Sequence, residues 1–161
     1  MTLDRKATAI HEAGHAVIGR VLGLPCGKVT TISDDPAELG HAVVEDPIHG
    51  WRRGDGPRRQ MVEASCMSLY AGAEAERVIL GKQGDDVGDG PDCSKAASLI
   101  ELIGVRGASF VGDEVWERYE ARLRARSNQL VRLHRAKIER VGAALMERGE
   151  LSANEIDELI A

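Results

Sequence analysis

Two histidines and a glutamate within one short segment are the residues of this chain best suited to chemistry. The segment reads His11-Glu12-Ala13-Gly14-His15. In a helix, residues four positions apart project from the same face, so both imidazoles can reach one metal ion. Glu12 stands beside the first histidine, where its carboxylate can take a proton from a metal-bound water. The segment therefore predicts His11 and His15 as metal ligands and Glu12 as a general base.

The spacing H-E-x-x-H is typical of zinc-dependent peptidases, but it supplies only two ligands. A catalytic zinc ion needs three protein ligands and keeps one position for water. The residues alone leave the third ligand open, with five candidates elsewhere in the chain: Glu74, Glu76, His41, His49 and Asp92. Asp92 is expected at the start of a helix, where free N–H groups and the helix dipole keep a carboxylate ionised. Its local chemistry by itself favours a helix N-cap without a metal.

The helix that must position the two histidines is expected over residues 4–22. One apolar row comprises Ile10, Ala13, Val17 and Val21, and the next row comprises His11, His15, Ile18 and Leu22. Since the histidines share a row with core residues, they should point toward neighbouring elements. The absence of a side chain at Gly14 would let another backbone approach this turn of the helix. Turn residues over 23–27 end the helix.

Further along the chain, the pattern predicts two short strands and then mostly helices. Strands over 28–33 and 39–45, joined by a turn at 34–36, should form an antiparallel pair. A loop over 46–59 and a helix over 60–80 follow, then an acidic, glycine-rich loop over 81–91. Helices dominate from Asp92, with a break around 107–113 and an interruption near Ser127-Asn128 in the long pattern over 114–148. Gly149 ends this pattern, and a capping box over 152–155 opens a last helix to Ile160.

Composition favours one predominantly helical α+β domain spanning residues 1–161. Hydrophobic residues make up 43% of the 161 residues and aromatic residues only 3%, so small aliphatic side chains must build the core. The net charge of −5 argues against a nucleic-acid partner, although residues 114–148 hold nine Lys/Arg against five Glu. The sequence has no apolar run of the roughly 20 residues that span a bilayer. Three cysteines without a C-x-x-C pair (Cys26, Cys66 and Cys93) predict free thiols in a reducing cytoplasm.

Residues 9–17 resemble the zinc helix in the peptidase domain of FtsH-type ATP-dependent zinc metalloproteases. Later segments resemble the same domain in the same order: 28–32 and 39–41 its strand pair, 70–81 its G-G-R-A-A-E-E-L-x-x-G helix, 88–96 its G-A-S-N-D-L-x-x-A segment, and 138–159 its C-terminal helices. The resemblance implies this metallopeptidase fold, with a small antiparallel β element and a zinc helix. It also implies a Zn²⁺ ion held by His11, His15 and Asp92, with Glu12 as base.

The chain departs from this family in ways that matter for function. Pro91 and Cys93 stand where the family has asparagine and leucine, and residues 102–126 differ most. No G-x-x-x-x-G-K-[ST] motif occurs, and neither the ATPase module nor the membrane segments of the family are present. We therefore expect a stand-alone, ATP-independent, cytoplasmic domain acting on unfolded proteins or peptides, to which a separate ATPase or unfoldase could deliver folded substrates. The family also implies assembly into a homo-oligomeric ring.

These observations favour a zinc-dependent metalloendopeptidase, a hydrolase of the HExxH type. Glu12 would activate a zinc-bound water, and Glu76 is a candidate to orient a zinc histidine from behind. One alternative is a catalytically idle metal-binding module that regulates a protease or ATPase partner. Another is a metal-dependent hydrolase with a non-peptide substrate. The glutamate beside the first histidine argues against the idle module, because a pure binder has no use for a base there.

Overall fold

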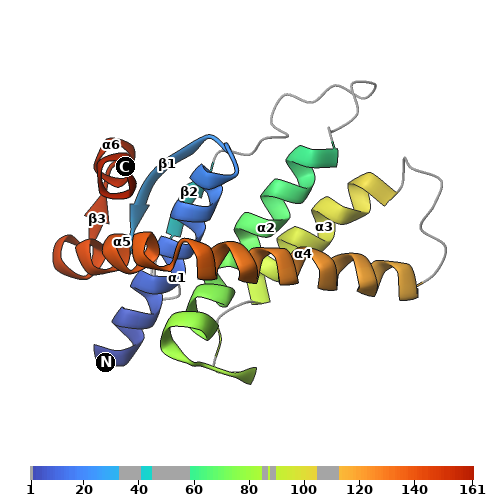
Figure 1. Cartoon of the computed structure of the whole chain (residues 1–161), viewed down its shortest axis with the longest axis horizontal. Coiled ribbons are helices and arrows are strands. Elements are labelled where there is room, and N and C mark those ends of the chain that lie inside the picture. Colours follow the sequence, from blue (N-terminus) through green and yellow to red (C-terminus); the bar gives the residue numbers. More distant parts are fainter. Residues whose placement is uncertain (1, 33–40, 45–58, 85–86, 88–89, 105–112) are drawn as a thin grey trace.

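The computed structural model describes residues 2–32, 41–44, 59–84, 87, 90–104 and 113–161. Helix α1 (Thr2–Val21) packs mainly against α2 (Arg59–Ala75) and α5 (Arg135–Arg148). Helices α4 (Asp113–Leu133) and α5 follow one another across the molecule, and α3 (Gly90–Gly104) lies against α2 (Figure 1). A short helix, α6 (Ala153–Ile160), ends the chain. The predicted α+β fold with mostly helical content is confirmed.

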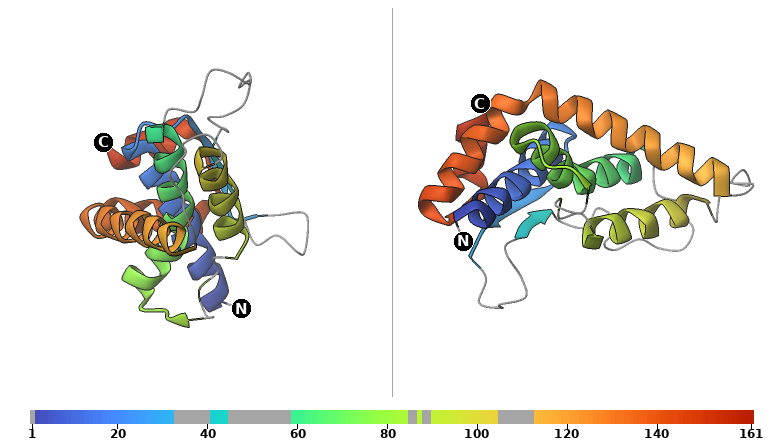
Figure 2. Two further views of the ribbon diagram at one scale, coloured as in Figure 1. Left: turned by 90° about the vertical axis from the view of Figure 1, so that its right-hand side faces the viewer. Right: turned by 90° about the horizontal axis from the view of Figure 1, so that it is seen from below.

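Two apolar clusters hold these helices together, and α2 contributes to both. The first joins α1, α5, α6 and the strands around fully buried residues such as Val17, Ile138 and Leu145. The second joins α2, α3 and α4 around Tyr70, Ile100 and Leu123. The right-hand view of Figure 2 shows the first group of elements at the end where the chain begins and finishes, and α3 with most of α4 at the other. The histidine-bearing α1 therefore crosses α2 where the two clusters meet.

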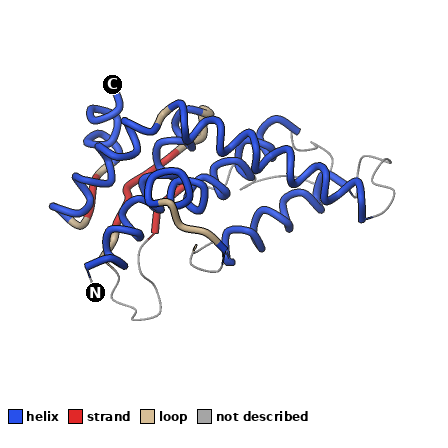
Figure 3. Tube along the Cα trace, turned by 60° about the horizontal axis from the view of Figure 1, so that its bottom comes forward, coloured by secondary structure: helices blue, strands red, loops and turns tan. Residues whose placement is uncertain are grey.

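The strands form a small antiparallel sheet in the order β2-β1-β3. The predicted pair is confirmed with shifted ends, as β1 (Cys26–Thr30) and β2 (His41–Val44), and the partner of Val29 in β2 is Ala42. On its other side Val29 pairs with Leu151 of β3 (Glu150–Leu151), a strand that the sequence did not predict. Figure 3 shows the strands among the helices of the first cluster.

The helix predicted over 60–80 changes from α-helical to π-helical geometry near its end. After α2, residues Glu76–Leu80 form a π-helical turn, labelled η1, which ends at Gly81 with a left-handed φ of 71°. The helix predicted over 60–80 is therefore confirmed, and its last five residues have π-helical geometry that the sequence did not indicate. Single π turns of this kind occur often at functional sites.

Two other predicted helix boundaries also differ. The long helical pattern breaks at His134, between α4 and α5, and not near Ser127-Asn128. Ser127 is fully buried and its hydroxyl donates to the carbonyl of Met67, so it joins α4 to α2 without ending the helix. Asp92 lies inside the first turn of α3 and is not its N-cap. The helix ends predicted at Gly149 and at the capping box of Ser152 and Glu155 are confirmed.

Several sequence predictions concern residues outside the described part of the chain. They are the turn at 34–36, most of the loop over 46–59, most of the break around 107–113, and parts of the acidic loop over 81–91. Among the described residues, no helix is both long enough and apolar enough to cross a membrane. All three cysteines are free thiols, as predicted.

Candidate metal centre

A close contact between α1 and α2 sets the position of the two histidines. A Cβ atom on Gly14 would lie 2.5 Å from the carbonyl oxygen of Ala71, so this glycine lets the backbone of α2 approach α1. From the other side, a Cβ atom on Gly72 would lie 2.5 Å from His15 Nε2 and 2.6 Å from His11 Nε2. Each helix thus leaves out a side chain at the contact, and the space beside Gly72 holds the two imidazole rings.

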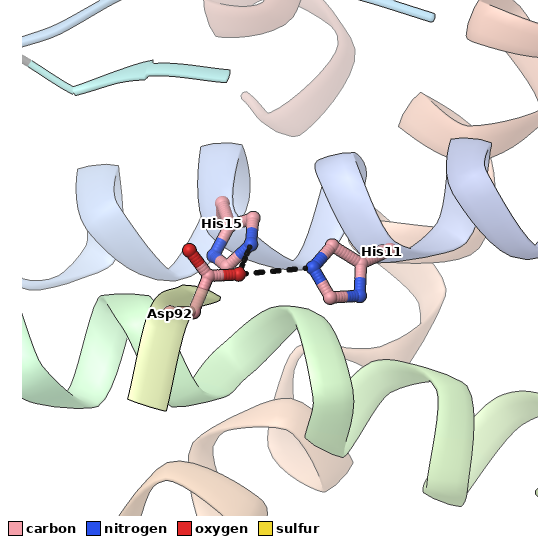
Figure 4. A group of neighbouring side chains, drawn as sticks. All are labelled: His11, His15 and Asp92. Atoms are coloured by element: carbon pink, nitrogen blue, oxygen red, sulfur yellow. Dashed lines mark hydrogen bonds and ion pairs between the residues drawn. The ribbon is translucent and has the colours of Figure 1, made fainter. Parts of the chain in front are cut away.

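The structure brings His11, His15 and Asp92 together. The centroids of the two imidazole rings are 4.7 Å apart and the ring planes make an angle of 77°. Asp92 Oδ2 lies 3.2 Å from His11 Nε2 and 3.1 Å from His15 Nε2 (Figure 4). Ligand atoms bound about 2.0–2.1 Å from a tetrahedral zinc ion lie about 3.3 Å from one another. The two nitrogen–oxygen distances are close to this value, and all three ligand atoms lie within 4.8 Å of one another, so the group could hold a single small cation.

The opposite nitrogens of both rings are held by oxygen atoms of α2 and η1. His15 Nδ1 lies 2.7 Å from the carbonyl oxygen of Ser68, which can only accept a hydrogen bond. His11 Nδ1 lies 2.6 Å from Glu76 Oε1. When Nδ1 donates in this way, the lone pair of a neutral imidazole is on Nε2, the atom that faces Asp92. Both rings are thus oriented to present Nε2 to a metal.

Burial and hydrogen bonds within the cluster shift the pKa values of His11 and Asp92. Burial lowers the pKa of His11, but hydrogen bonds with Asp92 and Glu76 outweigh it and raise that pKa to about 9. Burial raises the pKa of Asp92, but hydrogen bonds with His11 and His15 hold it well below its usual range. Without a metal, His11 is therefore an imidazolium between two carboxylates. A metal ion and this proton compete for the same nitrogen.

Two other candidate ligands, Glu74 and Glu76, have partners outside the cluster of His11, His15 and Asp92. Glu74 is buried and accepts hydrogen bonds from Arg77 and Asn128, each at 2.7 Å, so it joins α2 to α4. Glu76 contacts the Nδ1 side of His11, away from the shared cluster. His41 begins β2, and the placement of its side chain lies outside the described part of the chain. His49 lies outside the described residues.

Glu12 is 7% exposed and follows His11 on α1. The sequence predicted it as a base, and that role stays a prediction.

Gly72, Ser68 and Lys82 were missed as parts of the site. Ser68 and Gly72 belong to the run of small residues in α2, which indicated tight helix contact but not which atoms make it. The ammonium group of Lys82 lies 2.8 Å from Glu76 Oε2. The residues around Lys82 in the sequence do not indicate that it belongs to the site.

Comparison with known proteins gives several related sequences, whereas no family model matches the chain. It is 27% identical, over 98% of its length, to the ATP-dependent zinc metalloprotease FtsH 4 of Sorangium cellulosum. It is 28% identical, over 95% of its length, to FtsH 3 of the same organism, and 28% identical, over 98%, to FtsH 1 of Symbiobacterium thermophilum. The chain spans 28–29% of the length of these three relatives.

Proposed function

Because the chain is related over nearly its whole length to the FtsH-type ATP-dependent zinc metalloproteases, we propose that it is a zinc metalloendopeptidase that hydrolyses peptide bonds in unfolded polypeptides or peptides. The observation that carries this proposal is the convergence of His11 Nε2, His15 Nε2 and Asp92 Oδ2. Relatives that are named as zinc metalloproteases support zinc as the ion.

His11, His15 and Asp92 would hold the zinc ion. When bound, zinc would polarise the scissile carbonyl group and lower the pKa of water to about 7. Glu12 would act as the general base: its carboxylate takes a proton from the attacking water. As the C–N bond breaks, Glu12 passes that proton to the nitrogen of the leaving amine.

Glu76 would orient His11 from behind. Its Oε1 atom, 2.6 Å from His11 Nδ1, accepts the N–H of the ring, and its side chain is only 4% exposed. A carboxylate in this position fixes the tautomer and the plane of a metal-binding histidine. The same contact supports the role that the sequence suggested for this residue.

An extended substrate could bind along β2. Within the described residues β2 pairs only with β1, and it lies against α1, the helix that carries the site. A peptide that pairs with the other edge of β2 would gain main-chain hydrogen bonds without a requirement for particular side chains. Such binding suits a peptidase that acts on unfolded chains.

The domain extent, the compartment, the partners and the assembly of this protein are proposals as well. We propose residues 1–161 as one domain, acting in the cytoplasm without ATP of its own, with no nucleic-acid partner and with assembly into a homo-oligomer. Residues 1–161 hold no phosphate-binding G-x-x-x-x-G-K-[ST] motif, so an ATPase or unfoldase outside these residues would be needed to present folded substrates.

The test compares zinc content and degradation of an unfolded protein for the wild type, Glu12→Gln and Asp92→Ala. Glu12→Gln should keep zinc and lose at least about a hundredfold in turnover, because general-base catalysis is worth about 10²–10⁴-fold. Asp92→Ala should lose zinc, because only two protein ligands remain. Full zinc and full activity in Asp92→Ala would show that the ligand assignment is wrong. A zinc-loaded wild type that cleaves no unfolded protein or peptide would overturn the proposed activity.

A further inference from the structure

The carboxylate of Glu76 is held on both of its oxygen atoms. Oε1 lies 2.6 Å from His11 Nδ1, and Oε2 lies 2.8 Å from the ammonium nitrogen of Lys82. The side chain of Glu76 is 4% exposed and that of Lys82 is 30% exposed. A chain of contacts thus runs from a lysine at the edge of the site, through a buried carboxylate, to the ring of His11.

The backbone of η1 makes the contact between Glu76 and Lys82 possible. In a regular α-helix, residues six positions apart are rotated by about 240° and face different directions. Here the π turn over Glu76–Leu80 ends at Gly81, whose φ of 71° reverses the chain. The N–H groups of Gly81 and Lys82 both donate to the carbonyl oxygen of Glu76, the second at 3.4 Å. Lys82 is therefore turned back over the residue that begins the turn.

Charge balance assigns a specific task to Lys82. The buried carboxylate of Glu76 contacts the ring of His11 on one oxygen and the ammonium group of Lys82 on the other. A histidine that binds a metal is neutral, so in a loaded site His11 no longer carries a positive charge. Lys82 would then be the charged donor that still holds the buried Glu76 carboxylate in place.

We propose that Lys82 is a positioning residue for the metal centre. It holds Glu76 so that the other carboxylate oxygen accepts the Nδ1–H of His11, and this bond turns Nε2 of His11 toward His15 and Asp92. The inference goes beyond the proposed function and rests on it in one respect, which is that His11 is a zinc ligand.

The experiment measures zinc affinity by competition with a chromophoric chelator. Lys82→Met should weaken zinc binding about tenfold, at the lower end of the effects of residues that support metal ligands. Lys82→Arg, which keeps a charged donor, should stay within about threefold of the wild type. Lys95→Met is the matched control: this ammonium lies 3.9 Å from Asp92 Oδ1 but the side chain is 68% exposed. It removes the same charge beside the same cluster, and zinc affinity should change by less than about twofold.

A double-mutant cycle separates positioning from a long-range charge effect. If Lys82 acts through Glu76, then Lys82→Met in a Glu76→Gln background should change zinc affinity by less than about twofold. A charge effect alone has the opposite sign, because removal of a cation near the site would tighten the binding of a dication. Unchanged or tighter zinc binding in Lys82→Met would overturn the inference, and so would a tenfold loss that persists in the Glu76→Gln background.

The same measurements distinguish this inference from the proposed function. Wild-type zinc binding that depends on His11 and Asp92, together with no cleavage of any unfolded substrate, would refute the peptidase and leave the Lys82 result valid. A wild type whose zinc binding does not depend on His11 and Asp92 would overturn both. Circular dichroism of each variant shows whether it is folded.

Discussion

Gly72→Ala should remove the metal site while it preserves the fold. The added Cβ atom would lie 2.5 Å from His15 Nε2, 2.6 Å from His11 Nε2 and 2.7 Å from His11 Cδ2. Atoms that are not bonded approach to about 3.5 Å, so both imidazole rings must move by nearly 1 Å. A zinc site tolerates errors of about 0.2 Å in its ligand distances. The displacement is several times larger, and we expect zinc affinity to fall by at least about a hundredfold.

The stability of the metal-free protein should change much less. Alanine is favoured over glycine within a helix by about 1 kcal/mol. The atoms that the new methyl group meets are the ends of side chains, and these can rotate away. That rotation lengthens the hydrogen bonds of His11 to Glu76 and of His15 to Ser68, at about 1 kcal/mol or more each. The free energy of unfolding should therefore fall by only about 1–2 kcal/mol.

Two assays check this prediction: chelator competition for zinc affinity, and urea unfolding in EDTA for the metal-free stability. Gly142→Ala is the control, because it is also a buried helical glycine packed against α1. Its added Cβ would lie 2.7 Å from Ile10 Cδ1 and touch no metal ligand, so zinc affinity should be unchanged. The reasoning is refuted if Gly72→Ala binds zinc like the wild type. It is also refuted if Gly142→Ala loses zinc equally, since the loss would then reflect general damage to the helix contact.

Two further predictions concern buried polar groups. The metal-free protein should lose stability as the pH rises from about 6.5 to about 9. The pKa of His11 is raised from 6.5, its ordinary value, to about 9 in the folded protein. The protonated ring therefore stabilises the fold fully below the unfolded pKa, and this stabilisation is lost as the pH rises through the folded pKa. Urea midpoints in EDTA across this range should fall for the wild type but not for His11→Ala, and a flat wild-type profile contradicts the prediction. Tyr70→Phe should raise the melting temperature, because the Tyr70 hydroxyl is buried without a hydrogen-bond partner among the described residues. A destabilised Tyr70→Phe would mean that this hydroxyl has a partner.

Features that depend on nearby residues could be predicted from the sequence. The amphipathic rows of residues 4–22 predicted the helix of the histidines, and β-branched residues predicted the strand pair. The capping box at Ser152 and the helix end at Gly149 follow from bonds between residues a few positions apart. Each of these features depends on residues that lie close together in the sequence, so a short window of sequence contains the pattern that predicts it.

Features that depend on distant partners were wrong or missing. Ser127 suggested a helix break because serine often ends helices, but Met67, far away in the sequence, offers its hydroxyl an acceptor. Strand β3 consists of two residues and exists because β1 lies beside it. The π turn at Glu76 lies in a segment whose residues suit an ordinary α-helix.

The residues of the candidate site show the same difference between local features and features that depend on distant partners. The sequence by itself predicted His11, Glu12 and His15 as site residues, because a spacing of four within one helix is a local geometry. It offered Asp92 only as one of several carboxylates and histidines, and the resemblance to a family then selected it. Only the tertiary structure decided that Asp92, 81 positions from His11, lies beside both rings, and that Glu74 is occupied elsewhere. That decision rests on the packing of α1 against α2 through Gly14 and Gly72 and on the packing of α3, which carries Asp92, against α2. No short window of sequence contains these contacts.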